Sequence, residues 1–206
     1  MKKILLLIVI VMVGVIFISS CSKNDILEHY NNVIQSVGHV ELTKKSLVLN
    51  DIINVDVKNG DIKNVKEYYR PSSFDYVICN PPYFPVENMP NQREKFNHNI
   101  SRHEILCNLS DVIQAIRYLV KQNGKFSLVH RTYRISDIIS ECEKNGLAIK
   151  RIRFVYSKAT SETSKIVLIE GSISKVSDIK VEQPFYIYNE DGSYTEEMKK
   201  VYGIYE

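Results

Sequence analysis

The pattern of apolar and polar positions predicts an α/β domain over most of the chain. Apolar residues recur at helical spacing from Leu109 to Val120 and again from Ile135 to Cys142. Short apolar or alternating runs predict strands, which we place at 53–57, 76–79, 125–130, 149–156, 166–169 and 186–188. Strands that alternate with helices indicate a sheet whose site lies at the carboxyl ends of the strands.

Turn and capping residues set the expected ends of these elements. Asn108 or Ser110 is expected to begin the helix near 109–120, and Asn123-Gly124 to end it. We also expect a helix at 40–50. The residues between 24 and 36 fit an amphipathic helix and equally a linker.

The first segment has a different character. Lys2-Lys3 precede an unbroken apolar run from Ile4 to Ile18, followed by Ser19-Ser20-Cys21. A basic start, an apolar stretch of about 15 residues and small residues before a cut site are marks of an export signal. The run is shorter than the roughly 20 residues of a membrane span. A buried strand or core helix is the alternative.

Ile18-Ser19-Ser20-Cys21 resembles a bacterial lipobox, which implies cleavage before Cys21 and lipidation of its thiol. We therefore expect residues 1–22 to be a signal or membrane anchor and residues 23–39 to be a linker or helix. Residues 40–206 form the folded domain.

Composition adds little further restriction. The chain has 206 residues, 44% of them hydrophobic, which suits one domain with its own core. The net charge of +3 permits a nucleic-acid partner without arguing for one. The cysteines at 21, 79, 107 and 142 have no metal-ligand spacing, so we expect no metal site and no disulfide framework.

The strand at 76–79 runs directly into Asn80-Pro81-Pro82-Tyr83-Phe84. The two prolines stiffen this turn, because each fixes its own φ and Pro82 also restricts Pro81. A stiff turn can hold an Asn side chain and a backbone carbonyl beside an aromatic face. Those two acceptors can take both hydrogens of an exocyclic amine while the ring stacks on the base. A plain strand that ends in a proline turn is the alternative.

Asp75-x-x-x-x-Asn80-Pro81-Pro82-Tyr83-Phe84 resembles motif IV of the S-adenosylmethionine-dependent amino-methyltransferases. Other segments, in the same order, resemble the bacterial tRNA1(Val) (adenine-37-N6)-methyltransferase family. They are 49–50, 59–62, 102–104, 124–131, 152–156, 167–171, 184–188 and 194–197. The resemblance runs from about Glu41 to the C-terminus and implies a class I, Rossmann-like α/β sheet.

The family's pattern implies a role for several residues. Asn80 and the Pro81 carbonyl would bind the adenine amine, Pro82 would stiffen the turn, and Tyr83 would stack on the base. Asp61 would contact the adenine of the cofactor, S-adenosyl-L-methionine, with Asn80 close by. Asp61 can equally cap the next helical turn.

A substrate-binding role is expected for Phe84, Arg102 and His103. Helix capping is the alternative for Arg102.

The sequence also departs from the family's pattern. The family has a first, central strand followed by a glycine-rich loop, and an acidic residue at the end of its second strand. No G-x-G occurs here, and Glu41 falls in the expected helix at 40–50. We therefore expect a sheet without the usual first strand and without the loop that binds the cofactor.

These observations predict a cytoplasmic RNA adenine-N6 methyltransferase, with tRNA as the expected substrate and with weakened cofactor binding. Two alternatives stay open. One is a non-catalytic lipoprotein attached to the membrane through residues 1–21. The other is a truncated or fused reading frame of such an enzyme, which would leave the domain incomplete at its N-terminal side. A glutamine methyltransferase of release factors shares Asn-Pro-Pro-Tyr but fits the remaining segments less well.

Overall fold

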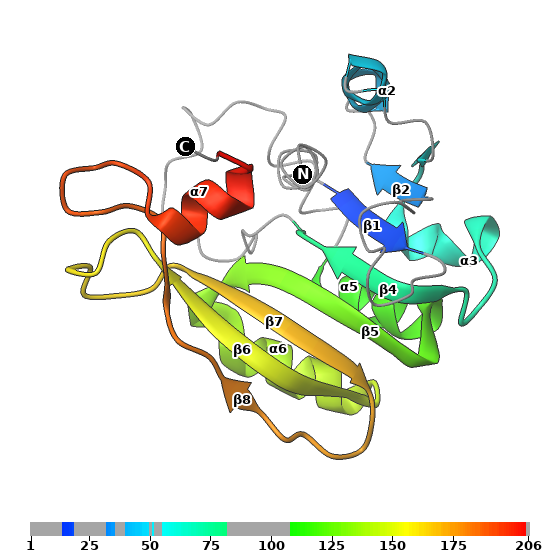
Figure 1. The fold of residues 1–206 in the computed structure, drawn as a ribbon. Helices are drawn as coiled ribbons and strands as arrows, with labels where there is room; N and C mark the ends of the chain where they lie inside the picture. The colour runs from blue at the N-terminus through cyan, green and yellow to red at the C-terminus, as the bar shows by residue number, and fades with distance from the viewer. Residues whose placement is uncertain are drawn as a thin grey trace, which may run out of the picture.

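A mixed sheet organises the protein (Figure 1). The computed structural model describes residues 14–18, 32–35, 40–49, 51, 55–81 and 108–204. Its strands are β1 Gly14–Ile18, β2 Asn32–Gln35, β3 Asp56–Asn59, β4 Phe74–Cys79, β5 Val120–Arg131, β6 Leu147–Tyr156, β7 Ile166–Ile173, β8 Lys180–Val181 and β9 Phe185–Tyr186. Its helices are α2 Val40–Leu49, α3 Val65–Tyr68, α5 Leu109–Leu119, α6 Ile135–Lys144 and α7 Glu196–Tyr202, with short 3₁₀ helices η2 Ile62–Asn64 and η4 Thr132–Arg134.

The strands lie in the order β3-β2-β1-β4-β5-β7-β6-β8, and β9 pairs with β6. The pairs β2–β3 and β4–β5 are parallel, while β7 runs antiparallel to both β5 and β6. β1 is antiparallel to both of its neighbours, β2 and β4. It follows that β2, β3, β4, β5 and β6 point the same way, so their carboxyl ends meet at one edge of the sheet. We call this edge the carboxyl edge.

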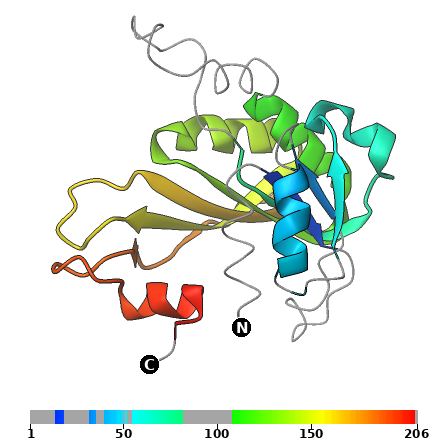
Figure 2. The same cartoon turned by 90° about the horizontal axis from the view of Figure 1, so that it is seen from above.

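Helices cover one face of this sheet. Seen from above, α5 and α6 lie on one side of the strands and α7 lies on the other (Figure 2). The amphipathic faces of α5 and α6 supply Ile113, Ile116 and Ile138, which are fully buried against the sheet residues Phe126 and Leu128. Burying such side chains contributes about 1.5–3 kcal/mol each, so this layer fixes the positions of β4 and β5.

The place beside β4 that the family's first strand would occupy is taken by β1. Gly14–Ile18 belongs to the apolar run that the sequence marks as an export signal. Val15 pairs with Cys79, and Ile18 pairs with Tyr76. Because β1 is antiparallel to β4, a parallel first strand is absent from the described part of the sheet.

Several local predictions agree with the structure. The helix expected at 40–50 is α2, and Glu41 lies within it. Asn108 caps α5 by accepting a hydrogen bond from the backbone N–H of Asp111, whose carboxylate accepts one from the Asn108 N–H in return. Gly146 follows α6 with a φ of +69°, as expected for a glycine after a helix.

Other predictions were wrong. Part of the segment at 24–36, for which a helix and a linker fitted equally, is strand β2. Asn123-Gly124 does not end a helix, because α5 stops at Leu119 and β5 already begins at Val120. The described part of the strand expected at 53–57 is β3, which extends to Asn59, two residues further than expected. In each case, pairing with a neighbouring strand outweighs the local turn or helix signal.

Helix α7 has no counterpart among the sequence predictions. Thr195 caps it by accepting a hydrogen bond from the Met198 N–H, and Gly203 ends it in the left-handed conformation. Within the described parts of the chain, no helix is long and apolar enough to cross a membrane.

Gly171 in the middle of β7 offers a test of this packing. A Cβ at this position would lie 2.5 Å from the Phe126 ring and 2.5 Å from the Ala148 carbonyl oxygen. We expect Gly171→Ala to lower the free energy of unfolding by about 1–3 kcal/mol, as overpacked cores do. Urea denaturation measures it, with Ser172→Ala as the neighbouring control. Equal stability of Gly171→Ala and the wild type would contradict the packing of β7 on β5.

Candidate active site

Asn80 is the polar residue that the sheet buries at its carboxyl edge. It follows β4, whose residues Val77 and Cys79 are completely buried, and its own side chain is only 8% exposed. Pro81 behind it is also buried. A polar side chain at this depth has to be hydrogen-bonded in the folded protein. β4 therefore places the Asn80 amide and the Pro81 carbonyl at one defined point of the carboxyl edge.

Asp61 lies at the same edge, beyond the end of β3. Its carboxylate caps η2, where Oδ1 accepts a hydrogen bond from the Lys63 backbone N–H at 2.9 Å. Lys63 Nζ lies 3.6 Å from Oδ2. The capping role expected as an alternative for Asp61 is therefore confirmed. Each carboxylate oxygen has two lone pairs, so capping leaves acceptor capacity for a further donor.

The strand order fixes how far apart these two acceptors lie across the sheet. Going from β3 to β4 crosses β2 and β1, which is three strand spacings, or about 14 Å. Gly14, the first residue of β1, pairs with Gln35 at the end of β2. The start of β1, not its end, therefore lies between Asp61 and Asn80.

His130 lies on the strand next to Asn80 and was not singled out as a site residue by the sequence. Cys79 pairs with Leu128, so His130 stands just beyond the level of Asn80. Its side chain is 3% exposed, and Nδ1 accepts a hydrogen bond from the Arg131 N–H at 2.8 Å. Burial, together with the nearby positive charges of Arg134 and Arg131, lowers the pKa of His130 to about 4. The ring is thus neutral at pH 7.

A polar network ties the strands together on the face opposite α5 and α6. The Tyr76 hydroxyl donates to Glu170 Oε2 at 3.0 Å and lies 2.6 Å from Ser127 Oγ. Lys125 and Arg151 each place a nitrogen 3.4 Å from Glu170 Oε1. Burial raises the pKa of Tyr76 to about 12, so it stays a neutral donor. This network joins β4, β5, β7 and β6 and holds the strand that carries Asn80 in register.

The remaining residues predicted for the site lie outside the described residues. They are Cys21, Pro82, Tyr83, Phe84, Arg102 and His103. Their roles stay predictions. Within the described ranges, no group of three or more histidine, cysteine, aspartate or glutamate side chains is placed to hold a metal ion.

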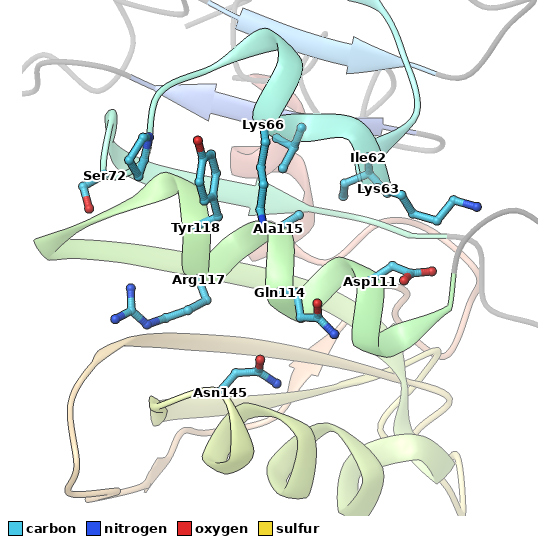
Figure 3. Close-up of a pocket in the computed structure, with 12 residues that line it drawn as sticks. Ile62, Lys63, Lys66, Ser72, Asp111, Gln114, Ala115, Arg117, Tyr118 and Asn145 are labelled. Atoms are coloured by element: carbon cyan, nitrogen blue, oxygen red, sulfur yellow. The ribbon is translucent and has the colours of Figure 1, made fainter.

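A cavity of about 470 Å³ lies away from Asn80, on the outer side of the helix layer (Figure 3). It runs from Ile62 and Lys63, next to Asp61, to Ser72 and Tyr118. Neither Asn80 nor Pro81 lines it. This cavity is therefore separate from the amide that the sequence singles out.

Comparison with known proteins identifies distant relatives of the chain. No family model matches the chain. It is 21% identical over 140 residues to the tRNA1(Val) (adenine(37)-N6)-methyltransferase of Cytophaga hutchinsonii, which covers 67% of this chain and 57% of that protein. The enzyme of the same name from Photobacterium profundum is 27% identical over 135 residues, covering 66% and 54%. The chain is a distant relative of these methyltransferases.

Solved structures agree at the level of the fold. A predicted O-methyltransferase from Agrobacterium tumefaciens matches with a TM-score of 0.62 at 15% identity, covering 84% of this chain and 76% of that one. The M protein of the type I restriction enzyme EcoKI matches with a TM-score of 0.51 at 12% identity, covering 87% and 42%. The Rossmann-like methyltransferase fold is therefore confirmed. The chain spans a little over half the length of the curated methyltransferases it matches.

The buried His130 predicts how stability depends on pH. Its pKa of about 4 lies below the unfolded value near 6.5, so the unfolded chain binds the extra proton between these values. The free energy of unfolding therefore falls as pH drops from 6.5 toward 4, by about 2–3 kcal/mol at pH 4.5.

Denaturant titrations at pH 7 and pH 4.5 measure this loss. His130→Asn keeps an acceptor for the Arg131 N–H but does not titrate, so we expect it to lose about 2–3 kcal/mol less than the wild type over this interval. Equal losses in the two proteins would show that His130 does not carry the effect.

Proposed function

We propose that the protein transfers a methyl group from S-adenosylmethionine to the N6 amine of an adenine in RNA, with tRNA as the substrate. The observation that carries the proposal is the buried Asn80 followed by Pro81 at the carboxyl end of β4. The distant relationship to tRNA adenine-N6 methyltransferases supports it. So does the fold, because open α/β sheets bind their ligands at this edge.

In this proposal, Asn80 Oδ1 and the Pro81 carbonyl oxygen accept the two hydrogens of the amine. Because both acceptors bind hydrogens of the same nitrogen, the nitrogen lone pair is directed toward the methyl donor. Pro82 stiffens the turn, and Tyr83 stacks on the base, which has to leave its own stack to enter the site. Phe84, Arg102 and His103 contact the substrate. The protein's contribution is positioning, since no covalent intermediate is required.

The residues present fit one part of the cofactor. S-adenosylmethionine supplies a sulfonium methyl group. Asp61 can accept a hydrogen bond from the amine of the cofactor's adenine, and Asn80 is proposed to lie close to the methyl group. β2 ends in Gln35, so it does not provide the acidic residue expected at the end of the second strand. The carboxyl end of β1 points away from Asn80, so it cannot lead into a cofactor loop at this edge. We therefore propose weak cofactor binding.

Cofactor affinity is measured by calorimetry on the full chain. We expect S-adenosylmethionine to bind weakly, because the chain lacks a glycine-rich loop to bring backbone N–H groups to the cofactor. A micromolar dissociation constant would contradict this expectation and would establish a donor site without that loop.

Methyl transfer is measured at saturating cofactor by mass spectrometry of nucleosides from a tRNA substrate. We expect N6-methyladenosine with the wild-type chain and about a 100-fold slower rate with Asn80→Ala, comparable to removing one hydrogen-bonding group from a preorganised site. Asn80→Asp keeps an acceptor oxygen and should retain more activity than Asn80→Ala. Transfer that is insensitive to Asn80→Ala, or that occurs at a hydroxyl group, would overturn the proposal.

A second candidate function rests on residues 1–22. We propose as the alternative a non-catalytic lipoprotein held in the membrane through a lipidated Cys21. Residues 14–18 cannot serve both forms in one molecule, because cleavage before Cys21 removes β1 and leaves one edge of β4 unpaired. The alternative therefore predicts a mature protein with a different sheet from the one described above.

Metabolic labelling with a fatty-acid probe separates the two forms. The lipoprotein predicts a labelled, membrane-bound chain that becomes unlabelled after Cys21→Ser. The cytoplasmic methyltransferase predicts unlabelled protein in the soluble fraction, with no change in Cys21→Ser. Sensitivity of the label to globomycin identifies processing at the lipobox.

A further inference from the structure

Tyrosine side chains gather at the carboxyl edge beyond Asn80. β6 points the same way as β4 and β5, so its last residue, Tyr156, lies at this edge. β9 is parallel to β6 and pairs Tyr186 with Tyr156. In Figure 1, β4 points toward the side of the molecule where α7 and the preceding turn lie. Tyrosines distant in the sequence are thus brought to the edge that holds the proposed amine clamp.

The rings form a series with short spacings. Tyr156 and Tyr186 have centroids 5.9 Å apart, and Tyr188 stacks on Tyr194 at 5.3 Å with an interplanar angle of 14°. Tyr194 also lies 5.2 Å from Tyr202 of α7. All five rings are half-buried, so each keeps part of its surface open to solvent.

Tyr133 adds a more exposed ring nearer to Asn80. It lies in η4, directly after β5, the strand next to β4, and its side chain is 63% exposed. An exposed tyrosine on a short turn contributes little to a core, whereas aromatic faces at a surface are favourable places for bases to stack. Its position fits a contact with a nucleotide next to the target base.

Acidic side chains lie in the segments that carry these rings, so the surface is not a basic patch. The acidic residues nearby are engaged by partners: Glu190 by Thr160, Asp191 by Ser193, Glu196 by Lys199 and Glu197 by Arg153. The Lys158 ammonium donates to the Glu190 carbonyl oxygen at 2.8 Å. A nucleic-acid ligand bound here would gain more binding free energy from contacts with the rings than from ion pairs with its phosphates.

The span of the edge sets the length of such a ligand. From β4 to β6 the order crosses β5 and β7, about 14 Å, and β9 adds a further spacing to give about 19 Å. Stacked bases rise about 3.4 Å each, so about six nucleotides cover this distance. A duplex would present its bases to each other, whereas an unpaired strand can offer them to the tyrosines.

We propose that Tyr133, Tyr156, Tyr186, Tyr188 and Tyr194 form a stacking path for unpaired RNA nucleotides that flank the target adenine. The path rests on the proposed function, because it assumes an adenine of RNA at Asn80. Tyr133 contacts the nucleotide nearest the target, and the rings beyond β6 contact more distant ones.

Fluorescence anisotropy tests the path. The binding partners are the full chain and a labelled single-stranded RNA of nine nucleotides with a central adenine. We expect Tyr133→Ala to weaken binding by about 5- to 150-fold, the range of one lost base–aromatic stack. Tyr133→Phe keeps the ring and should bind within about twofold of the wild type. Tyr188→Leu tests the distal rings in the same way, with thermal melting to verify its fold.

Two further measurements separate stacking from other causes. Replacing one flanking base by an abasic residue should cost as much as Tyr133→Ala at a single position, and the two changes together should cost no more than either alone. The slope of log affinity against log salt should be unchanged in Tyr133→Ala, because no phosphate contact is lost. Tyr118→Leu, on the helix layer, is the control for loss of a ring elsewhere.

The outcomes are distinct. Wild-type affinity in both Tyr133→Ala and Tyr188→Leu, or equal losses in Tyr133→Phe and Tyr133→Ala, would overturn the stacking path while leaving the Asn80 clamp intact. Tighter binding to the same sequence as a duplex would also overturn it. Complete absence of RNA binding by the wild-type chain would remove the path and the proposed RNA substrate together. Tyrosine-dependent binding without methyl transfer would keep the path and reject the catalytic proposal.

Discussion

The pairing of β4 on both of its edges is the constraint on which the rest of this structure depends. β4 is buried at Val77 and Cys79, so its backbone groups have no access to water and require hydrogen-bonding partners on each side. β5 supplies one side in parallel register, and β1 supplies the other in antiparallel register. Unless both edges are paired, the strand that carries Asn80 has no fixed position.

The interactions around β4 divide between the two faces of the sheet. On one face, apolar contacts from α5 and α6 set the distance between the helix layer and the strands. On the other, the Tyr76, Ser127 and Glu170 contacts link β4 to β5 and β7. Apolar packing is not directional, whereas hydrogen bonds are, so the polar network specifies the register that packing alone leaves open. The apolar packing and the polar network together set the position of Asn80.

The parts of the fold that sequence predicted well are those in which local and long-range preferences agree. α5 and α6 combine helical spacing with clear end signals, and β6 and β7 are short apolar or alternating runs. Prediction failed where pairing overrides local preference, as at β2 and at the start of β5. The reversed direction of β1 was not predicted, because a continuous apolar run is more typical of parallel strands than of antiparallel ones.

The candidate site was predictable to a similar extent. Asn80 stood out because a stiff turn follows an apolar strand, and Asp61 because an acidic residue follows Asn59-Gly60. His130 did not stand out, because its burial and its closeness to Asn80 arise only when β5 pairs with β4. The tyrosines at the carboxyl edge are likewise scattered between 133 and 202, and only the parallel alignment of β4, β5, β6 and β9 brings them to one side.

The direction of β1 separates the two tasks that a methyl transfer requires. In the proposed function, holding the acceptor amine depends on the end of β4, which needs a partner strand but not a partner of a particular direction. Holding the donor depends on a loop that leaves the central strand at the carboxyl edge, and this requires that strand to be parallel. An antiparallel β1 satisfies the first requirement and not the second. The sheet can therefore keep the geometry of the acceptor site while losing the usual geometry of the donor site, and the two properties have to be measured separately.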